Sequence, residues 1–281
     1  LGGQVHERLR AYTYLYPEEG DRGDVYKDAD LAAERAIEVM NQGFTAVKFD
    51  PAGPYSAFDP RQPSLERMDI SENIVKRVRE AVGDRCDILF GTHGQFTTSG
   101  ALRLAKRLEK YDPLWFEEPT PPDSEHEMAK LAAKTSIPIA TGERLCTKYE
   151  FARVLRSGAA SIVQMALGRV GGLLEGKKIA GICEVYYAQI APHMYCGPIS
   201  AMADIQLSTC TPNFLLQESI KTMGGFHAEI VKQPIRVEEG YIIPPTAPGL
   251  GIELNEEVAR ANPYTGKQLH LEMSDKPETH S

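Results

Sequence analysis

The chain of 281 residues is long for a single domain but usual for one α/β barrel. Its hydrophobic content of 42% and charged content of 25% are typical of a globular protein with a large core. The net charge of −8 argues against a nucleic-acid-binding surface, because phosphate contacts need clustered Lys and Arg, whereas a small anionic substrate needs only local positive charge.

The sequence also limits the compartment. Five scattered cysteines without a Cys-x-x-Cys pair favour reduced thiols over a disulfide framework or a zinc site. No stretch has the apolar length of a membrane helix, and no signal peptide is visible. The first residues, LGGQVHERLR, lack an initiator methionine and indicate a fragment. We expect a cytoplasmic homo-oligomer with a small-molecule partner and no nucleic-acid or membrane partner.

Short β-rich runs alternate with amphipathic segments along the whole chain. Helical spacing of apolar residues is clear in residues 69–81, 99–110 and 171–185, and Asp69 with Glu72 resembles a capping box. About eight strand–helix units in this length favour a closed parallel barrel over an open doubly wound sheet, and no GxGxxG motif supports dinucleotide binding. The expected strands are LRAYTYLY, TAVKFD, CDILFG, LWFEE, IPIATGE, ASIVQMA, YAQIAPH and NFLLQES.

One connection is long for a βα loop. Residues 51–68, PAGPYSAFDPRQPSLERM, separate the second strand from the next helix. The segment is either a mobile surface loop or an active-site flap, because loops at the carboxyl ends of barrel strands build the site. As a flap it could deliver Tyr55 and Arg61.

Polar residues gather where the expected strands end. The carboxyl ends of barrel strands converge, so these side chains are candidates for one site. Two glutamates on neighbouring strands suit a hard divalent cation such as Mg²⁺, although buried ion pairs are a common alternative for such acids. The candidates are Lys48, Asp50, His93, Gln95, Glu117, Glu118, Glu143, Arg144, Gln164, His193, Gln217 and Glu218.

The stretches WFEEP, TGER, GRVGGLLEGKKIA and APHMYCGPI resemble the mandelate racemase-like branch of the enolase superfamily, especially its sugar-acid dehydratases. The resemblance covers the chain as a barrel domain. It implies a modified (β/α)8 barrel of (β/α)7β type, without the α+β capping domain that precedes the barrel in that family. We expect the barrel in residues 1–245, and in residues 246–281 a strap that would pack on the missing cap.

The resemblance implies a reaction. Family members bind Mg²⁺ through strand-end acids and remove the proton α to a carboxylate. The metal and a lysine stabilise the enediolate, and in dehydratases an acid expels a β-hydroxyl. For this chain it implies a lyase that dehydrates an aldonate-type sugar acid to a 2-keto-3-deoxy acid. It makes Glu117 and Glu143 the ligands of one Mg²⁺.

The resemblance also assigns the remaining site residues. Lys48 matches the first position of the strand-two Lys-x-Lys motif, whose second position holds Asp50. His93 matches an extra acid of some sugar-acid dehydratases, and His193 matches the strand-seven base. Glu218 matches a strand-eight acid near the substrate carboxylate. The catalytic candidates are Lys48, His93 and His193, together with Tyr55 from the long loop. The substrate-binding candidates are Asp50 and Glu218, together with Arg144 and Gln164 from the strand ends.

The sequence departs from the family pattern twice. Gly91 stands where the strand-three metal ligand is expected, so His93, Asp50 or water would complete the metal shell, or metal binding is weak or lost. Ala166 stands where a strand-six aspartate holds the base histidine. We therefore expect a lowered pKa for His193 and an orienting contact from Gln164.

Several alternatives follow from these departures. Lys48 either acts in catalysis or forms a structural salt bridge with Asp50 or a glutamate. Glu118 is expected to support the site by pairing with Arg144. The missing dyad raises a second activity, cycloisomerisation or epimerisation of a sugar acid such as an anhydro-sugar acid. The two lost residues together raise a third reading, a non-catalytic barrel that binds a ligand or serves as an oligomer scaffold.

Overall fold

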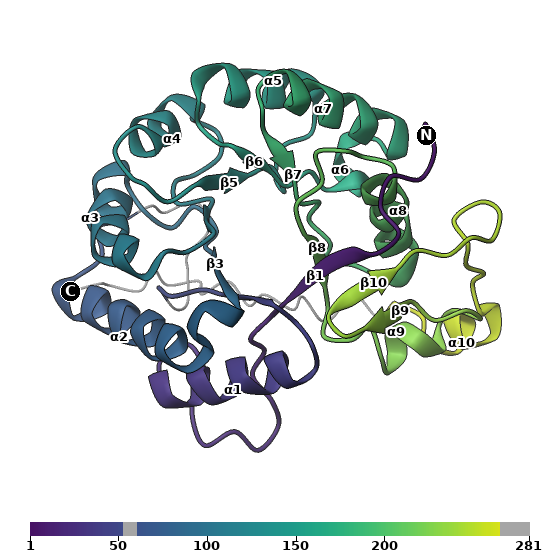
Figure 1. The fold of residues 1–281 in the computed structure, drawn as a ribbon, viewed down its shortest axis with the longest axis horizontal. Coiled ribbons are helices and arrows are strands. Elements are labelled where there is room, and N and C mark those ends of the chain that lie inside the picture. Colours follow the sequence, from purple (N-terminus) through teal and green to yellow (C-terminus); the bar gives the residue numbers. More distant parts are fainter. Residues whose placement is uncertain (53–60, 265–281) are drawn as a thin grey trace.

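The chain folds as a barrel of eight parallel strands surrounded by helices (Figure 1). The computed structural model describes residues 1–52 and 61–264. The barrel strands follow one another around the ring in chain order, which confirms the expected α/β barrel. They are β1 (Leu9–Tyr14), β2 (Ala46–Phe49), β3 (Asp87–Gly91), β4 (Trp115–Glu117), β5 (Ile139–Thr141), β6 (Ile162–Val163), β7 (Gln189–Ile190) and β8 (Gln217–Ser219).

The ring closes on both sides of β8. This strand pairs in parallel with β1, with Ala11 opposite Gln217. On its other side, the residues just before β8 pair with β7 through a single bridge between Ile190 and Phe214, at which the Ile190 and Leu215 amides donate across the seam at 2.9 Å. All eight expected strand segments therefore lie in the barrel wall.

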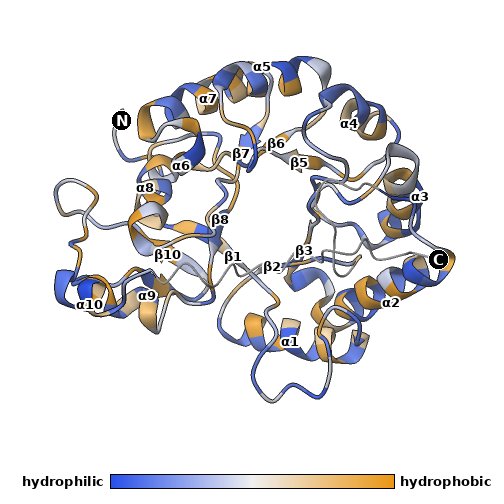
Figure 2. Cartoon of the chain, turned by 180° about the vertical axis from the view of Figure 1, so that it is seen from behind, coloured by the Kyte–Doolittle hydropathy of each residue, from blue (hydrophilic) through white to orange (hydrophobic). Residues whose placement is uncertain are grey.

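Helices form the outer layer, with mixed apolar and polar surfaces (Figure 2). α3 buries Ala101, Leu104, Ala105 and Leu108 at helical spacing, as predicted. None of the helices in residues 1–52 and 61–264 is long and apolar enough to cross a membrane. The helices are α1 (Ala29–Asn41), α2 (Leu65–Val82), α3 (Thr98–Leu108), α4 (Glu125–Ala132), α5 (Lys148–Ser157), α6 (Leu167–Val170), α7 (Leu173–Val185), α8 (Pro198–Thr209), α9 (Phe226–Glu229) and α10 (Glu256–Ala261).

The helix expected from residue 69 begins one turn earlier. Ser64 caps α2, and its hydroxyl accepts a hydrogen bond from the Arg67 amide at 3.2 Å. The capping box predicted at Asp69 and Glu72 is therefore wrong. Both acids lie inside the helix and pair with basic residues of the α3 region. The predicted helical spacing of the apolar residues holds, since Ile74 and Val78 are buried on α2, but Ser64 was the stronger signal for the start of the helix.

The sequence did not predict the hairpin of β9 (Arg236–Glu238) and β10 (Tyr241–Ile243). The hairpin pairs antiparallel with the start of β1, outside the parallel ring. In the expected strap after residue 245, Glu253 accepts a backbone hydrogen bond from Lys232, and α10 follows. The boundary at 245/246 and the role of the strap stay predictions, and residues 265–281 lie outside the described part.

The barrel interior contains a layer of apolar side chains, one from each strand or the residues beside it. Side chains alternate along a strand, so every second residue faces the interior. Tyr12 and Trp115 are the largest members and meet edge to face, with ring centroids 5.3 Å apart. The layer consists of Tyr12, Ala46, Leu89, Trp115, Ala140, Ile162, Ala191 and Leu216, and the larger core lies between the strands and the helices.

Candidate functional site

The candidate site is the next layer of the barrel. Moving two residues toward the carboxyl end from each interior residue keeps the side chain on the same face. The residues reached in this way are Tyr14, Lys48, Gly91, Glu117, Gly142, Gln164, His193 and Glu218. Five of them are predicted site residues, and Glu143 follows the turn at Gly142. The alternation of the strands thus brings residues far apart in the sequence into one ring.

Lys48 lies at the centre of this ring. Its side chain is 3% exposed, and its Nζ lies 2.7 Å from Glu117 Oε1 and 3.5 Å from Glu218 Oε1. The rings of Tyr12 and Tyr14 each lie 5.5 Å from the same nitrogen. Burial alone would lower the pKa of Lys48, but the two carboxylates raise it above its ordinary value, so the group remains an ammonium at neutral pH.

Glu117 uses both of its carboxylate oxygens. Oε1 accepts from Lys48 at 2.7 Å, and Oε2 accepts from the Gln164 amide at 2.8 Å. Gln164 was expected to contact substrate or to orient His193; its side-chain amide donates to Glu117, and its contact with substrate stays a prediction. Burial raises the pKa of Glu117 while Lys48 opposes the rise.

The space left by Gly91 is filled by its neighbours. A β-carbon on Gly91 would lie 2.5 Å from Lys48 Cε and 2.5 Å from Tyr14 Oη, closer than real side chains approach. The Tyr14 hydroxyl donates a hydrogen bond to the Gly91 carbonyl at 2.8 Å, which fixes the ring there. An aspartate at this position would meet both side chains.

His193 has two carboxylate partners in place of the missing strand-six aspartate. Its Nδ1 lies 3.1 Å from Glu218 Oε2 and 3.4 Å from Glu143 Oε2. Glu218 is itself held by the Met194 amide, which donates to Oε2 at 2.6 Å. A strand-eight glutamate therefore orients a strand-seven histidine, and Ala166, as predicted, supplies no carboxylate.

The predicted lowering of the His193 pKa is wrong. Burial does act in that direction, but Glu218 and Glu143 outweigh it and raise the pKa to about 9. In return Lys48 and His193 overcome the burial of Glu218 and hold its pKa well below the ordinary value. The sequence lacked the expected partner, but it could not show that Glu218 turns toward the imidazole. At pH 7 this histidine is an imidazolium.

His93 has the opposite charge state. Burial lowers its pKa to about 4, although the charge of Glu143 opposes the change. Its backbone amide donates to the Gln95 side chain at 3.2 Å. Glu143 interacts electrostatically with both histidines, and they lower its pKa in spite of burial. The site therefore presents one neutral and one protonated imidazole around a shared carboxylate.

Glu118 and Arg144 form the expected pair beneath the site. The Glu118 side chain is fully buried, and its Oε2 lies 2.7 Å from Arg144 Nη2 and 2.8 Å from Arg144 Nε. Arg144 also donates to the carbonyl of His93 at 2.9 Å. Its guanidinium is thus occupied by the protein. This contact positions the strand-three end, and the assignment of Arg144 to substrate binding stays a prediction.

Both ends of the long loop return to the strand-three end. The Gln95 amide lies 3.3 Å from Asp50 Oδ2, and the Arg61 amide donates to the Gln95 carbonyl at 3.0 Å. The loop after β2 is therefore anchored beside His93, where a flap would need to be. Tyr55 lies outside the described residues, and its catalytic role stays a prediction. Asp50 lies at the site edge, and its contact with substrate is likewise untested.

Three residues of the site were not predicted from the sequence. Tyr12 and Tyr14 were read only as part of an apolar strand, although their period-two spacing places both beside Lys48. Asp204 of α8 is fully buried, with neither carboxylate oxygen hydrogen bonded among the described residues. Burial raises its pKa well above the ordinary value, and the nearby charges that act on it are those of His193 and Glu218. A polar residue in an apolar helix was the available signal.

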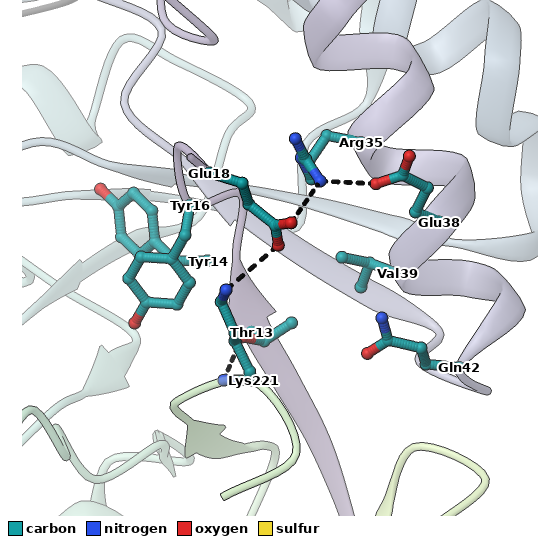
Figure 3. A pocket seen from close by; sticks show the side chains of 9 residues that line it. All are labelled: Thr13, Tyr14, Tyr16, Glu18, Arg35, Glu38, Val39, Gln42 and Lys221. Carbon is teal, nitrogen blue, oxygen red and sulfur yellow. Dashed lines mark hydrogen bonds and ion pairs between the residues drawn. The ribbon is translucent and has the colours of Figure 1, made fainter. Parts of the chain in front are cut away.

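A separate hollow lies beside β1 (Figure 3). Its charged groups neutralise one another, because Glu18 pairs with Arg35 at 3.2 Å and with Lys221 at 3.1 Å. Arg35 also pairs with Glu38 at 2.7 Å. Tyr14 lines this hollow as well as facing Lys48, so the hollow borders the strand-end site.

The residues present do not fit the usual metal arrangement of the resembling family. Of the three expected acidic ligands, Gly91 removes one, and Glu117 already accepts from Lys48 and Gln164. Glu143 faces His193. Across the described part of the chain, no group of three or more His, Cys, Asp or Glu side chains is arranged to hold a metal ion.

Sequence comparison relates this chain to known proteins. Residues 31–258 match the family described as enolase C-terminal domain-like. The chain is 34% identical over 274 residues to a D-xylonate dehydratase of Haloferax volcanii, covering 96% of this chain and 65% of that protein. It is 33% identical over 278 residues to a D-gluconate dehydratase of Thermoproteus tenax, covering 99% and 54%. The chain thus spans only part of these curated relatives.

Solved structures agree with the fold. A Labrenzia alexandrii DFL-11 structure of the mandelate racemase/muconate lactonizing enzyme type has 66% identity and a TM-score of 0.93, covering 96% of this chain and 69% of that one. A Sulfitobacter structure of the same description has 52% identity and a TM-score of 0.94, covering 98% and 69%. The arrangement of strands and helices in this chain is therefore that of solved structures of this type.

Proposed function

Since the chain belongs to the enolase C-terminal domain-like family, we propose that it is the barrel domain of a lyase that dehydrates an aldonate-type sugar acid. The reaction removes the proton α to the carboxylate, expels the β-hydroxyl as water and yields a 2-keto-3-deoxy acid. Relatives named as xylonate and gluconate dehydratases support this class. A sugar acid also suits a site that combines a buried ammonium with two imidazoles. A cytoplasmic location and a homo-oligomer stay predictions.

The observation that carries the proposal is the pair of imidazoles around Glu143. Dehydration needs a group that accepts the α-proton and a group that donates a proton to the departing hydroxyl. With a pKa of about 4, His93 is neutral at pH 7, and with a pKa of about 9, His193 is protonated. The resting site therefore holds one acceptor and one donor.

The resemblance assigns the histidines the other way, with His193 as base and His93 as acid. That assignment requires His193 to give up its proton before the first step, whereas acceptance by His93 requires no prior transfer. Lys48 lies where its positive charge would offset the negative charge of an enediolate. We assign acceptance to His93, donation to His193 and charge stabilisation to Lys48.

Superfamily members generally use Mg²⁺, and one ion held by Glu117 and Glu143 stays a prediction for this chain. When bound, such an ion would polarise the substrate carboxylate and acidify the α-carbon. Because Gly91 and the contacts of Glu117 do not fit this arrangement, the roles assigned to His93, His193 and Lys48 do not depend on a metal ion.

The proposal is tested with the full-length protein and a panel of aldonates that includes xylonate, gluconate and galactonate. We expect formation of a 2-keto-3-deoxy acid from at least one of them. His93→Gln and His193→Gln should each lose most of this activity, while His126→Gln, which changes an exposed helix residue, should retain it. Absence of turnover with the whole panel would reject the proposal. Exchange of the C2 proton without loss of water would instead support an epimerase or cycloisomerase.

A further inference from the structure

We propose that the Lys48 ammonium occupies the place of the metal ion, so that Glu117 and Glu143 form no Mg²⁺ site in this chain. The inference concerns the same side chains as the proposed function but does not depend on the reaction. It rests on three observations: the volume at Gly91, the contacts of Glu117, and the enclosure of Lys48.

The volume at Gly91 is the first observation. A lysine at this strand end is compatible with a neighbouring metal, so Lys48 alone decides nothing. What distinguishes this chain is that the Lys48 stem and the Tyr14 hydroxyl fill the space where a strand-three side chain would begin, each 2.5 Å from a β-carbon on Gly91. The loss of a carboxylate and the inward position of an ammonium therefore go together. With one carboxylate fewer and an ammonium in place, the site has less negative charge for a divalent cation to neutralise.

The contacts of Glu117 are the second observation. A metal ion bound to Glu117 would lie beside the Lys48 ammonium, which is 2.7 Å from Oε1, or beside the Gln164 amide, which is 2.8 Å from Oε2. Displacing Lys48 would move a fully buried cation away from its partner, and retaining it would place two cations side by side. Either arrangement opposes metal binding, because like charges repel strongly in a site that excludes water.

The enclosure of Lys48 is the third observation. Glu117 and Glu218 are the carboxylate partners of the ammonium, and the rings of Tyr12 and Tyr14 lie within cation–π distance. The ammonium is thus enclosed by two carboxylates and two aromatic rings of the protein itself, which supply the negative partners that a buried cation needs.

The first test is a calorimetric titration of the full-length protein with MgCl2 after treatment with EDTA, together with thermal unfolding at millimolar Mg²⁺. We expect no saturable heat and no change in unfolding temperature beyond that of a matched ionic-strength control. Saturable binding of one Mg²⁺ per chain that disappears in Glu117→Gln would overturn the inference. This titration needs no variant of Lys48, so it is decisive even where such a variant does not fold.

The second test measures whether Mg²⁺ binds once the Lys48 ammonium is removed. Lys48→Ala leaves Glu117 and Glu218 without their ammonium, so Mg²⁺ should now bind and raise the unfolding temperature. Lys48→Arg retains the charge and should remain indifferent to Mg²⁺. The matched control is Lys148→Ala, which removes a lysine paired with Glu175 outside the site and should gain no response. A folded Lys48→Ala protein without any Mg²⁺ response would overturn the assignment of Lys48 to the place of the ion.

The outcomes separate this inference from the proposed function. Dehydration of a sugar acid by an enzyme that needs bound Mg²⁺ would overturn the inference and leave the proposed function standing. A protein that binds no Mg²⁺ and turns over no sugar acid would overturn the proposed function and leave this inference standing.

Discussion

Replacement of Glu218 by glutamine should strongly lower the pKa of His193. The substitution keeps the size of the side chain and an oxygen that can accept from the Met194 amide. It removes the negative charge 3.1 Å from His193 Nδ1. Glu218 is the strongest of the groups that raise this pKa against the effect of burial. The variant therefore isolates the contact that stands in for the missing strand-six aspartate.

The magnitude follows from the shift itself. The pKa of His193 rises from 6.5 to about 9, and each unit corresponds to about 1.4 kcal/mol of preference for the protonated form. The environment thus favours the imidazolium by roughly 3 kcal/mol on that scale. Loss of one close opposite charge changes a pKa by about 1–3 units. Because Glu143 remains at 3.4 Å, we expect a fall of about 1–2 pKa units, which is smaller than the rise from 6.5 to about 9.

The assay is an NMR titration of protein with ¹³C-labelled histidine, in which His193→Gln identifies the His193 signal. Glu143→Gln should lower the pKa less than Glu218→Gln, since its oxygen lies farther from Nδ1. Glu253→Gln, which changes an exposed residue paired with Lys232, is the matched control and should have no effect. An unchanged His193 pKa in Glu218→Gln would refute the electrostatic account of this pair.

The remaining predictions concern stability. The raised folded-state pKa of His193 stabilises the protein fully below the unfolded value of 6.5, and this stabilisation is lost as the pH rises past about 9. In urea unfolding, His193 should therefore contribute up to about 3 kcal/mol to the free energy of unfolding at pH 6 and little above pH 10. Arg144→Ala leaves the buried Glu118 carboxyl without its donors and should cost about 1–3 kcal/mol in the same assay. Gly142→Ala should cost about 1–3 kcal/mol, because φ is +139° and the new methyl would meet Phe151 at 2.8 Å; a circular-dichroism melt as stable as wild type would contradict this. Because burial raises the pKa of Asp204, Asp204→Asn should gain stability relative to wild type as the pH rises above about 4, and a stability difference that does not change with pH would contradict this.

The barrel could be predicted because its signals are local and repeated. Each strand segment is short, β-rich and followed by a helical period, and the wall follows the chain order. The antiparallel hairpin of β9 and β10 could not be predicted in this way, because it is a single exposed element that breaks the repeat. The start of α2 was misplaced because two possible caps lay close together, and only the backbone shows that Ser64 is used.

The members of the site could be predicted, but their pairings could not. Strand alternation alone places Lys48, Glu117, His193 and Glu218 on one face of the barrel wall. Whether Glu218 turns toward Lys48 or His193 depends on side-chain geometry across the barrel, and the structure shows that it contacts both. For this reason the pKa of His193 was predicted in the wrong direction. A missing partner is visible in a sequence, while a substitute from another strand is not.

The most direct test of the proposed reaction is proton NMR of an accepted aldonate incubated with the full-length enzyme in D2O. We expect the C2 proton signal to disappear as the signals of a 2-keto-3-deoxy acid appear, with the rate of loss strongly reduced in His93→Gln. A C2 proton that exchanges with solvent while the substrate keeps its β-hydroxyl, or one that never exchanges with any member of the panel, would contradict the dehydratase account.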